Sequence, residues 1–74
     1  MFKEIKVDVN RIRRMYPKGT KVRLTEKMAD PQSPPVGAIG TVKFVDDIGD
    51  IHVSWDTGGS LALIPIVDEF EIIK

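Results

Sequence analysis

From Gly19 to the carboxy terminus, apolar and polar residues alternate with a period of two. A period of two places alternate side chains on opposite faces of a β-strand. Clusters of Gly, Asp and Pro interrupt the alternation, which predicts five short strands near residues 21–25, 37–45, 51–56, 61–65 and 70–72. The 74 residues allow one domain, and a closed barrel would leave such short strands without open edges. We therefore expect an all-β fold, a small antiparallel barrel of about five strands.

The apolar positions of these strands predict one shared interior. Its expected members are Val22, Val42, Val53, Trp55, Leu61 and Phe70. Gly40 lies inside a predicted strand, where glycine marks a bulge or a close approach of another group. Residues 46–50 and 56–59 are predicted to form tight turns, with Gly49 at a positive φ. Residues 28–37 contain three prolines and are predicted to form a loop, a length that is often functional.

The amino-terminal part of the chain has a different pattern. Residues 2–7 alternate only briefly and are predicted to form a short edge strand or a tail. Asp8 or Asn10 can cap a short helix that runs to about Met15, and Pro17 ends it. The apolar residues of this helix share one face, at Val9, Ile12 and Tyr16. We therefore divide the single domain into residues 1–17, a strand or tail plus a short helix, and residues 18–74, the barrel.

Composition favours a soluble protein in a reducing compartment. The chain has no Cys, so it has no disulfides, and 30% of its residues are charged. No apolar run approaches the ~20 residues that a membrane-spanning helix needs. Met1-Phe2-Lys3 leads straight into charged residues, without the apolar core of a signal peptide. We expect a cytoplasmic protein without membrane contact.

The net charge is zero, but the charges are segregated along the chain. Residues 1–27 hold nine Lys or Arg against three acids, a net +6, and residues 28–74 hold two Lys against eight acids, a net −6. Such asymmetry can mark a basic arm for nucleic acid. It can equally reflect one half of the chain folding back on the other, which is the interpretation that we favour.

Several motifs occur in the order found in a known family. They are Tyr16-Pro17-x-Gly19-x-x-Val22, Asp30-Pro31-x-x-Pro34-Pro35-x-Gly37, Gly40-Thr41-Val42, Val45-Asp46-Asp47-Ile48-Gly49 and Trp55-Asp56-x-Gly58. Over residues 12–73 the chain resembles short bacterial and phage proteins catalogued as domain of unknown function 4314. The segment that starts at Gly37 also resembles KOW-type strands, and Trp55-Asp56-x-Gly58 resembles a repeat signature of some ubiquitin ligases. These resemblances imply an SH3-like barrel and a mobile-element context (phage, plasmid or conjugative element), although this fold hosts many unrelated tasks.

The residues that enzymes use are nearly absent from the sequence. His52 is the only histidine, and its strand parity places it opposite Ile51, Val53 and Trp55, in solvent. The sequence has no phosphate-binding glycine loop and no paired-histidine motif. Asp46, Asp47 and Asp50 form the densest carboxylate group, but their spacing suits a turn better than a calcium loop. We expect no catalytic activity, no cofactor and no metal.

Two groups of residues are candidates for binding a partner. If Trp55 is half exposed rather than in the core, it can form an aromatic groove with Tyr16 and the proline loop, at Pro31, Pro34 and Pro35. The alternative is a basic surface, formed by Arg11, Arg13, Arg14, Lys18, Lys21 and Arg23. Nucleic-acid sites combine such cations with exposed aromatics, and only Tyr16 is well placed for that role.

The sequence therefore favours a non-enzymatic interaction module that binds a protein or peptide. The alternatives are a nucleic-acid-binding accessory factor that uses the basic amino-terminal portion, or a small inhibitor of a host defence system. Self-association stays open as well, through an apolar surface formed by Ile64, Ile66, Val67, Ile73 and the amino-terminal strand.

Overall fold

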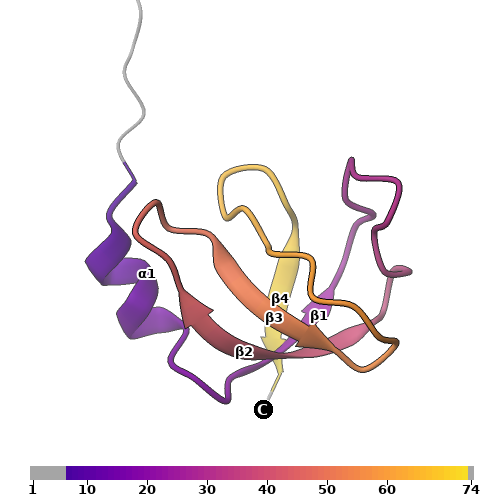
Figure 1. The fold of residues 1–74 in the computed structure, drawn as a ribbon, viewed down its shortest axis with the longest axis horizontal. Coiled ribbons are helices and arrows are strands. Elements are labelled where there is room, and N and C mark those ends of the chain that lie inside the picture. Colours follow the sequence, from indigo (N-terminus) through magenta and orange to yellow (C-terminus); the bar gives the residue numbers. More distant parts are fainter. Residues whose placement is uncertain (1–6, 74) are drawn as a thin grey trace, which may run out of the picture.

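The computed structural model describes residues 7–73, which form one short helix and four strands (Figure 1). The elements are α1 (Val9–Met15), β1 (Lys21–Leu24), β2 (Ile39–Val45), β3 (Ile51–Trp55) and β4 (Phe70–Ile73). The strands form one antiparallel sheet in the order β3-β2-β1-β4. Figure 1 shows this sheet bent around the interior, with α1 beyond one end of β2. Within residues 7–73 no helix is both long enough and apolar enough to cross a bilayer.

The register of the sheet places β1 between its two partners. Lys21 lies opposite Thr41 of β2 and Ile73 of β4, and Val42 of β2 lies opposite Val53 of β3. No pairing joins β3 to β4 in the described part of the chain, so they are the two edges of an open sheet. The β2–β3 register shifts between Val42 and Phe44, as at a β-bulge.

Helix α1 confirms the predicted cap and end. The backbone N–H of Arg11 donates to Asp8 Oδ1 at 3.1 Å, which satisfies one of the free amides of the first turn. The last turn closes with the N–H of Tyr16 donating to the carbonyl of Ile12 at 2.9 Å. Ile12 and Tyr16 are half-buried and pack against the core, as their shared face predicts. The predicted edge strand at residues 2–7 lies outside the described residues, except for Val7.

The interior is formed largely by the alternating residues. Its buried members are Val22, Leu24, Met28, Ala38, Val42, Val45, Ile51, Val53, Trp55 and Leu63, with Leu61 and Phe70 packed half-buried against them. Trp55 is only 3% exposed and therefore belongs to the core. Gly40 marks a close approach and not the bulge, because a Cβ there would lie 2.9 Å from Trp55 Cε3 and would clash with Val53 Cγ1.

The predicted fifth strand at residues 61–65 is absent. This segment runs beside β3 but forms only one bridge, in which Ile51 and Leu63 exchange two backbone hydrogen bonds of 2.8 Å. Farther along β3, the carbonyl of Leu61 instead accepts a hydrogen bond from Trp55 Nε1 at 2.8 Å. Because a side chain occupies that acceptor, no regular ladder continues along the edge of β3.

Candidate functional site

A stacked aromatic pair lies on the outer face of the β2–β3 hairpin. Phe44 and His52 are opposite each other in the register, with ring centroids 4.3 Å apart and ring planes inclined by only 10°. Strict alternation would place Phe44 on the same face as the buried Val42. The register shift between Val42 and Phe44 leaves Phe44 exposed beside the already exposed Lys43, with 52% of Phe44 accessible to solvent.

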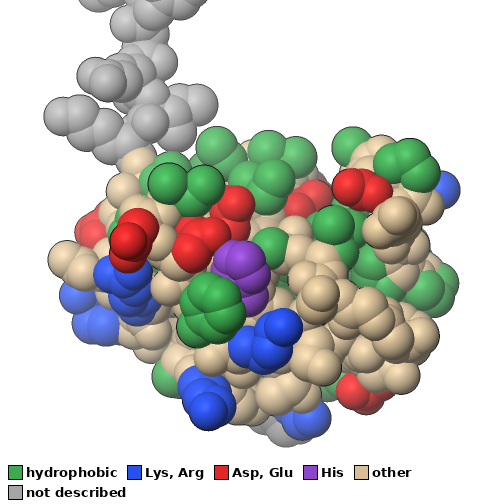
Figure 2. All heavy atoms as spheres, in the orientation of Figure 1, with side chains coloured by type: hydrophobic (Ala, Val, Ile, Leu, Met, Phe, Trp, Pro, Cys, Tyr) green, Lys and Arg blue, Asp and Glu red, His purple; other side chains and the backbone are tan. Residues whose placement is uncertain are grey.

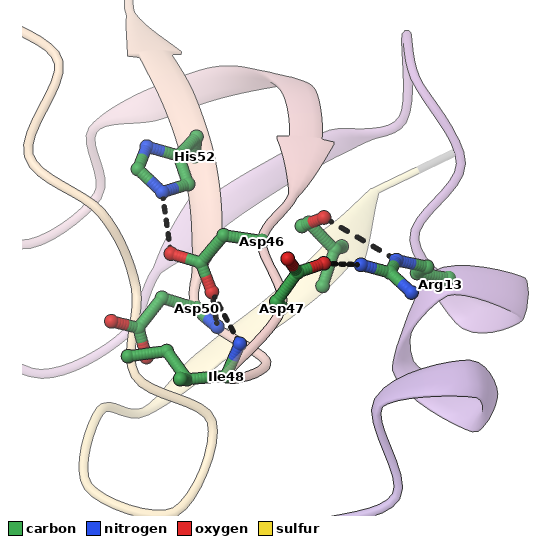
Figure 3. A network of polar contacts seen from close by, with 7 residues as sticks. Arg13, Asp46, Asp47, Ile48, Asp50 and His52 are labelled. Carbon is green, nitrogen blue, oxygen red and sulfur yellow. Dashed lines mark hydrogen bonds and ion pairs between the residues drawn. The ribbon is translucent and has the colours of Figure 1, made fainter.

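The carboxylate of Asp46 anchors His52 (Figure 3). Asp46 Oδ2 lies 2.8 Å from His52 Nε2, and Asp46 Oδ1 accepts from the backbone N–H groups of Ile48 and Asp50 at 3.1 and 2.9 Å. The bond to His52, with these two amides, holds the pKa of Asp46 below its ordinary value. The prediction that Asp46 serves its own turn is confirmed. The predicted strand parity of His52 is confirmed, but its side chain is half-buried by Phe44 and Asp46 instead of solvated.

Arg13 connects α1 to the same hairpin. Its Nη2 donates to Asp47 Oδ1 at 2.8 Å, and its Nε donates to the carbonyl of Val45 at 3.4 Å (Figure 3). The Asp46 carboxylate therefore serves the turn and the Asp47 carboxylate the helix contact, whereas Asp50 contributes its backbone N–H and carbonyl to the turn. In the described residues no three His, Cys, Asp or Glu side chains are grouped so that they could hold a metal ion.

A hollow of about 410 Å³ lies on one side of the aromatic pair, and we call it the Trp55 hollow. It is lined by Gln32, Pro34, His52, Trp55, Gly58, Gly59, Ser60, Leu61 and Ala62. The indole of Trp55 is held in place by its bond to Leu61. A tight turn follows β3, with the N–H of Gly58 donating to the carbonyl of Trp55 at 2.9 Å and positive φ at Gly58 and Gly59.

Side chains of the proline loop (residues 28–37) bond to the loop's own backbone and fix its conformation beside the Trp55 hollow. Asp30 Oδ1 accepts from the N–H of Gln32 at 2.8 Å, and Ser33 Oγ accepts from the N–H of Met28 at 3.0 Å. These side-chain bonds replace the ladder that the prolines prevent. They leave Pro34 buried against the hollow and Gln32 at its exposed rim.

A second hollow, of about 250 Å³, lies between α1 and β2, and we call it the Phe44 hollow. It is lined by Arg13, Tyr16, Pro17, Lys18, Lys43, Phe44 and Val45. Because Phe44 lines this hollow and His52 lines the other, the stacked pair separates the two. In Figure 2 the purple side chain is His52, the only histidine, and it lies between hydrophobic, basic and acidic side chains.

The structure brings together only part of the predicted aromatic groove. Trp55 and Pro34 line the Trp55 hollow, whereas Tyr16 lines the Phe44 hollow and packs on Phe70 with centroids 5.5 Å apart. Pro31 and Pro35 are exposed and line neither hollow. A single groove through Tyr16, Trp55 and the prolines is therefore not formed.

The predicted basic residues are spread over two elements and the turn between them. Arg11 and Arg14 are exposed on α1, and Arg13 and Lys18 line the Phe44 hollow. On β1, Lys21 Nζ donates to Thr41 Oγ1 at 2.6 Å, and Arg23 pairs with Glu71 at 3.0 Å. The pairs Arg13–Asp47 and Arg23–Glu71 join the basic half of the chain to the acidic half, which supports the predicted folding back of one half on the other.

Sequence reasoning missed Phe44 as a surface residue and did not include Lys43 among the candidate basic residues. Period-two parity alone assigns Phe44 to the interior. No Gly or other turn-forming residue next to Lys43 indicates the bulge. The hydrogen bond between His52 and Asp46 was also missed, although their separation of six residues across a tight turn is compatible with it.

Comparison with known proteins identifies one family. The family model described as "Domain of unknown function (DUF4314)" matches residues 5–73. No curated protein and no solved structure matches the chain.

Proposed function

The chain belongs to the DUF4314 family, and we propose that it is a non-enzymatic interaction module that binds an extended segment of another protein in the Trp55 hollow. We further propose that its bent sheet is a variant of the SH3-like barrel. Segment 59–63 supports this assignment because it covers the outer edge of β3, held by the hydrogen bonds of Trp55 to Gly59 and of Ile51 to Leu63.

The observation that carries the proposal is a hollow whose floor is formed by the buried Pro34 and Trp55 and whose rim is formed by the exposed Gln32, Gly58, Gly59 and Ser60. Pro34 and Trp55 come from two separate segments of the chain and form the apolar surface of the hollow with Leu61. Ligand sites in proteins usually measure about 300–1,000 Å³ and combine apolar walls with a few polar groups. At about 410 Å³, with Gln32 and Ser60 at exposed positions, the Trp55 hollow has this character.

The lining favours a polypeptide over a charged small molecule. It contains no Lys, Arg, Asp or Glu. Gly58, Gly59, Ser60 and Ala62 are small, so a partner's backbone can approach this stretch of main chain closely. The hydrogen bond to Leu61 already fixes the Trp55 ring before a partner binds. Binding therefore costs little side-chain conformational entropy at Trp55.

The chain carries its own reporter for this site, because Trp55 is the only tryptophan. Short random peptides displayed on phage would be selected against the protein, and the selected peptides titrated while Trp55 fluorescence and the indole N–H resonance are followed. We expect uncharged peptides of mixed apolar character to shift both signals in a saturable way.

A matched pair of variants tests the location. Ser60→Tyr places a ring in the hollow, whereas Thr57→Tyr places the same ring on the same turn but outside the lining. We expect Ser60→Tyr to weaken peptide binding at least about tenfold, the effect of 1.4 kcal/mol, and Thr57→Tyr to leave it unchanged. Failure to select any peptide, or equal effects of the two variants, would contradict the proposal.

A further inference from the structure

We infer that the Phe44 hollow is a binding site for single-stranded nucleic acid, in which one base stacks on Phe44 while Lys18 and Lys43 contact the adjacent phosphates. This inference goes beyond the proposed function, because it concerns the other hollow and another class of ligand. It also differs from the basic surface predicted from the sequence, which included neither Lys43 nor Phe44.

The stacking surface is the first part of the argument. His52 covers one face of the Phe44 ring at 4.3 Å, and Asp46 holds His52 at 2.8 Å. The ring is therefore kept in one orientation, yet half of the side chain stays exposed at the edge of the hollow. A nucleic-acid base stacks best on a large exposed aromatic ring whose other face is already packed. The ring then loses little conformational entropy when the base binds.

The charge around the ring is the second part. Arg13, Lys18 and Lys43 line the hollow, and no acidic side chain lines it. Among the described residues, Lys18 and Lys43 form no ion pair, whereas Arg13 is bound to Asp47. Two unpaired ammonium groups beside an aromatic ring suit a phosphate–base–phosphate unit, in which cations contact the backbone and the ring contacts the base.

The dimensions favour a single strand over a duplex. A hollow of about 250 Å³ beside one ring can take one unstacked base, and bases inside a duplex have no free face. The net charge of the chain is zero, so binding must depend on local contacts and not on a strong overall attraction. We therefore expect weak to moderate affinity and a small number of released counterions.

The test is fluorescence anisotropy with a labelled oligothymidylate of about 12 nucleotides, within the usual range of site sizes, at low salt. The slope of log K against log salt should be about −1.4 for two phosphate contacts on a single strand. Phe44→Ala should weaken binding at least about fivefold, and Phe44→Trp should retain it. The free mononucleotide should bind far more weakly than the strand.

A matched pair of double variants separates the hollow from diffuse charge. Lys18→Gln with Lys43→Gln removes two charges from the hollow, whereas Arg11→Gln with Arg14→Gln removes two exposed charges from α1 outside it. We expect the first to abolish most binding and to flatten the salt slope, and the second to change affinity less than about threefold. All four positions are exposed, so both proteins should fold.

Several outcomes would overturn the inference. Equal losses in the two double variants would show diffuse attraction and no site. Equal affinity for an abasic strand would show that no base is bound. Equal affinity for the mononucleotide would show that no strand is needed, and equal affinity for an acidic peptide would show that the site does not select nucleic acid. The Lys18 and Lys43 variant should still bind peptide at Trp55, so failure of this inference and failure of the proposed function are distinguishable.

Discussion

Trp55 Nε1 donates a hydrogen bond of 2.8 Å to the carbonyl oxygen of Leu61, and this bond replaces a β-ladder contact at the edge of β3. It lets a buried indole satisfy its only donor and places segment 59–63 across the strand edge. It also fixes one wall of the Trp55 hollow. One residue therefore links the core, the covered edge and the candidate peptide site.

Trp55→Phe should destabilise the fold and loosen segment 59–63. The change removes the donor to Leu61 and leaves a poorly solvated carbonyl without its partner, a cost of about 1–3 kcal/mol. Urea unfolding measures the global loss, and amide hydrogen exchange measures the segment. Val53→Ala is the control, because it weakens the core without touching this bond; exchange at 59–63 that speeds up equally in both variants would contradict the role of the indole.

Asp46→Asn should lower stability at neutral pH, but the difference from wild type should fade in acid. The folded protein holds the pKa of Asp46 below its ordinary value, chiefly through the hydrogen bond to His52. A carboxyl whose pKa is lowered by folding contributes stability above its unfolded pKa, about 4, and that contribution is lost as the pH falls through the folded pKa. Urea midpoints from about pH 7 to about pH 2 should therefore converge at the acid end.

Asp47→Asn provides the comparison for Asp46. Asp47 forms an exposed ion pair with Arg13, and such pairs usually contribute less than about 1 kcal/mol. We expect Asp47→Asn to change the urea midpoint only slightly at neutral pH. If Asp47→Asn lowers the urea midpoint as much as Asp46→Asn does, the special position of Asp46 in the turn is not supported.

Gly40→Ala should destabilise the core by about 1–3 kcal/mol, the usual cost of overpacking. A methyl group at this position would clash with Val53 Cγ1 and lie 2.9 Å from Trp55 Cε3. Combining it with Val53→Ala removes one of the two obstacles. The double variant should therefore be more stable than the sum of the single effects predicts, as measured by a double-mutant cycle in urea; strict additivity would rule out the clash.

Gly49→Ala should cost more than Gly58→Ala, although both glycines have positive φ, 92° and 97°. A left-handed backbone conformation costs a residue with a Cβ about 1–2 kcal/mol, so Gly58→Ala, which meets no neighbour within 4 Å, should show that cost alone. At Gly49 the new methyl would also lie 2.8 Å from Val7 Cγ1 and 3.3 Å from Ile12 Cδ1. Thermal unfolding should rank the variants in this order, and equal melting temperatures would contradict the packing of α1 on this turn.

Alternation and local capping were sufficient to predict most of the secondary structure. Asp8 caps α1, Val22, Val42 and Val53 lie in the core, and Gly49 takes its positive φ in the hairpin turn. These features depend on neighbours in the chain or on a single buried face, and both can be read from residue types. The candidate sites were harder to predict: Trp55 and Pro34 do meet in a hollow, but Tyr16 lies elsewhere.

The sequence by itself determined that this chain forms antiparallel strands around a valine-rich interior, because a period of two can bury only one face of each strand. Tertiary structure alone decided that a bulge at Lys43 turns Phe44 outward onto His52. It also decided that the Trp55 indole takes the carbonyl that a fifth strand would have used. Both outcomes depend on contacts between segments that the linear pattern does not connect, and together they form the walls of the two hollows.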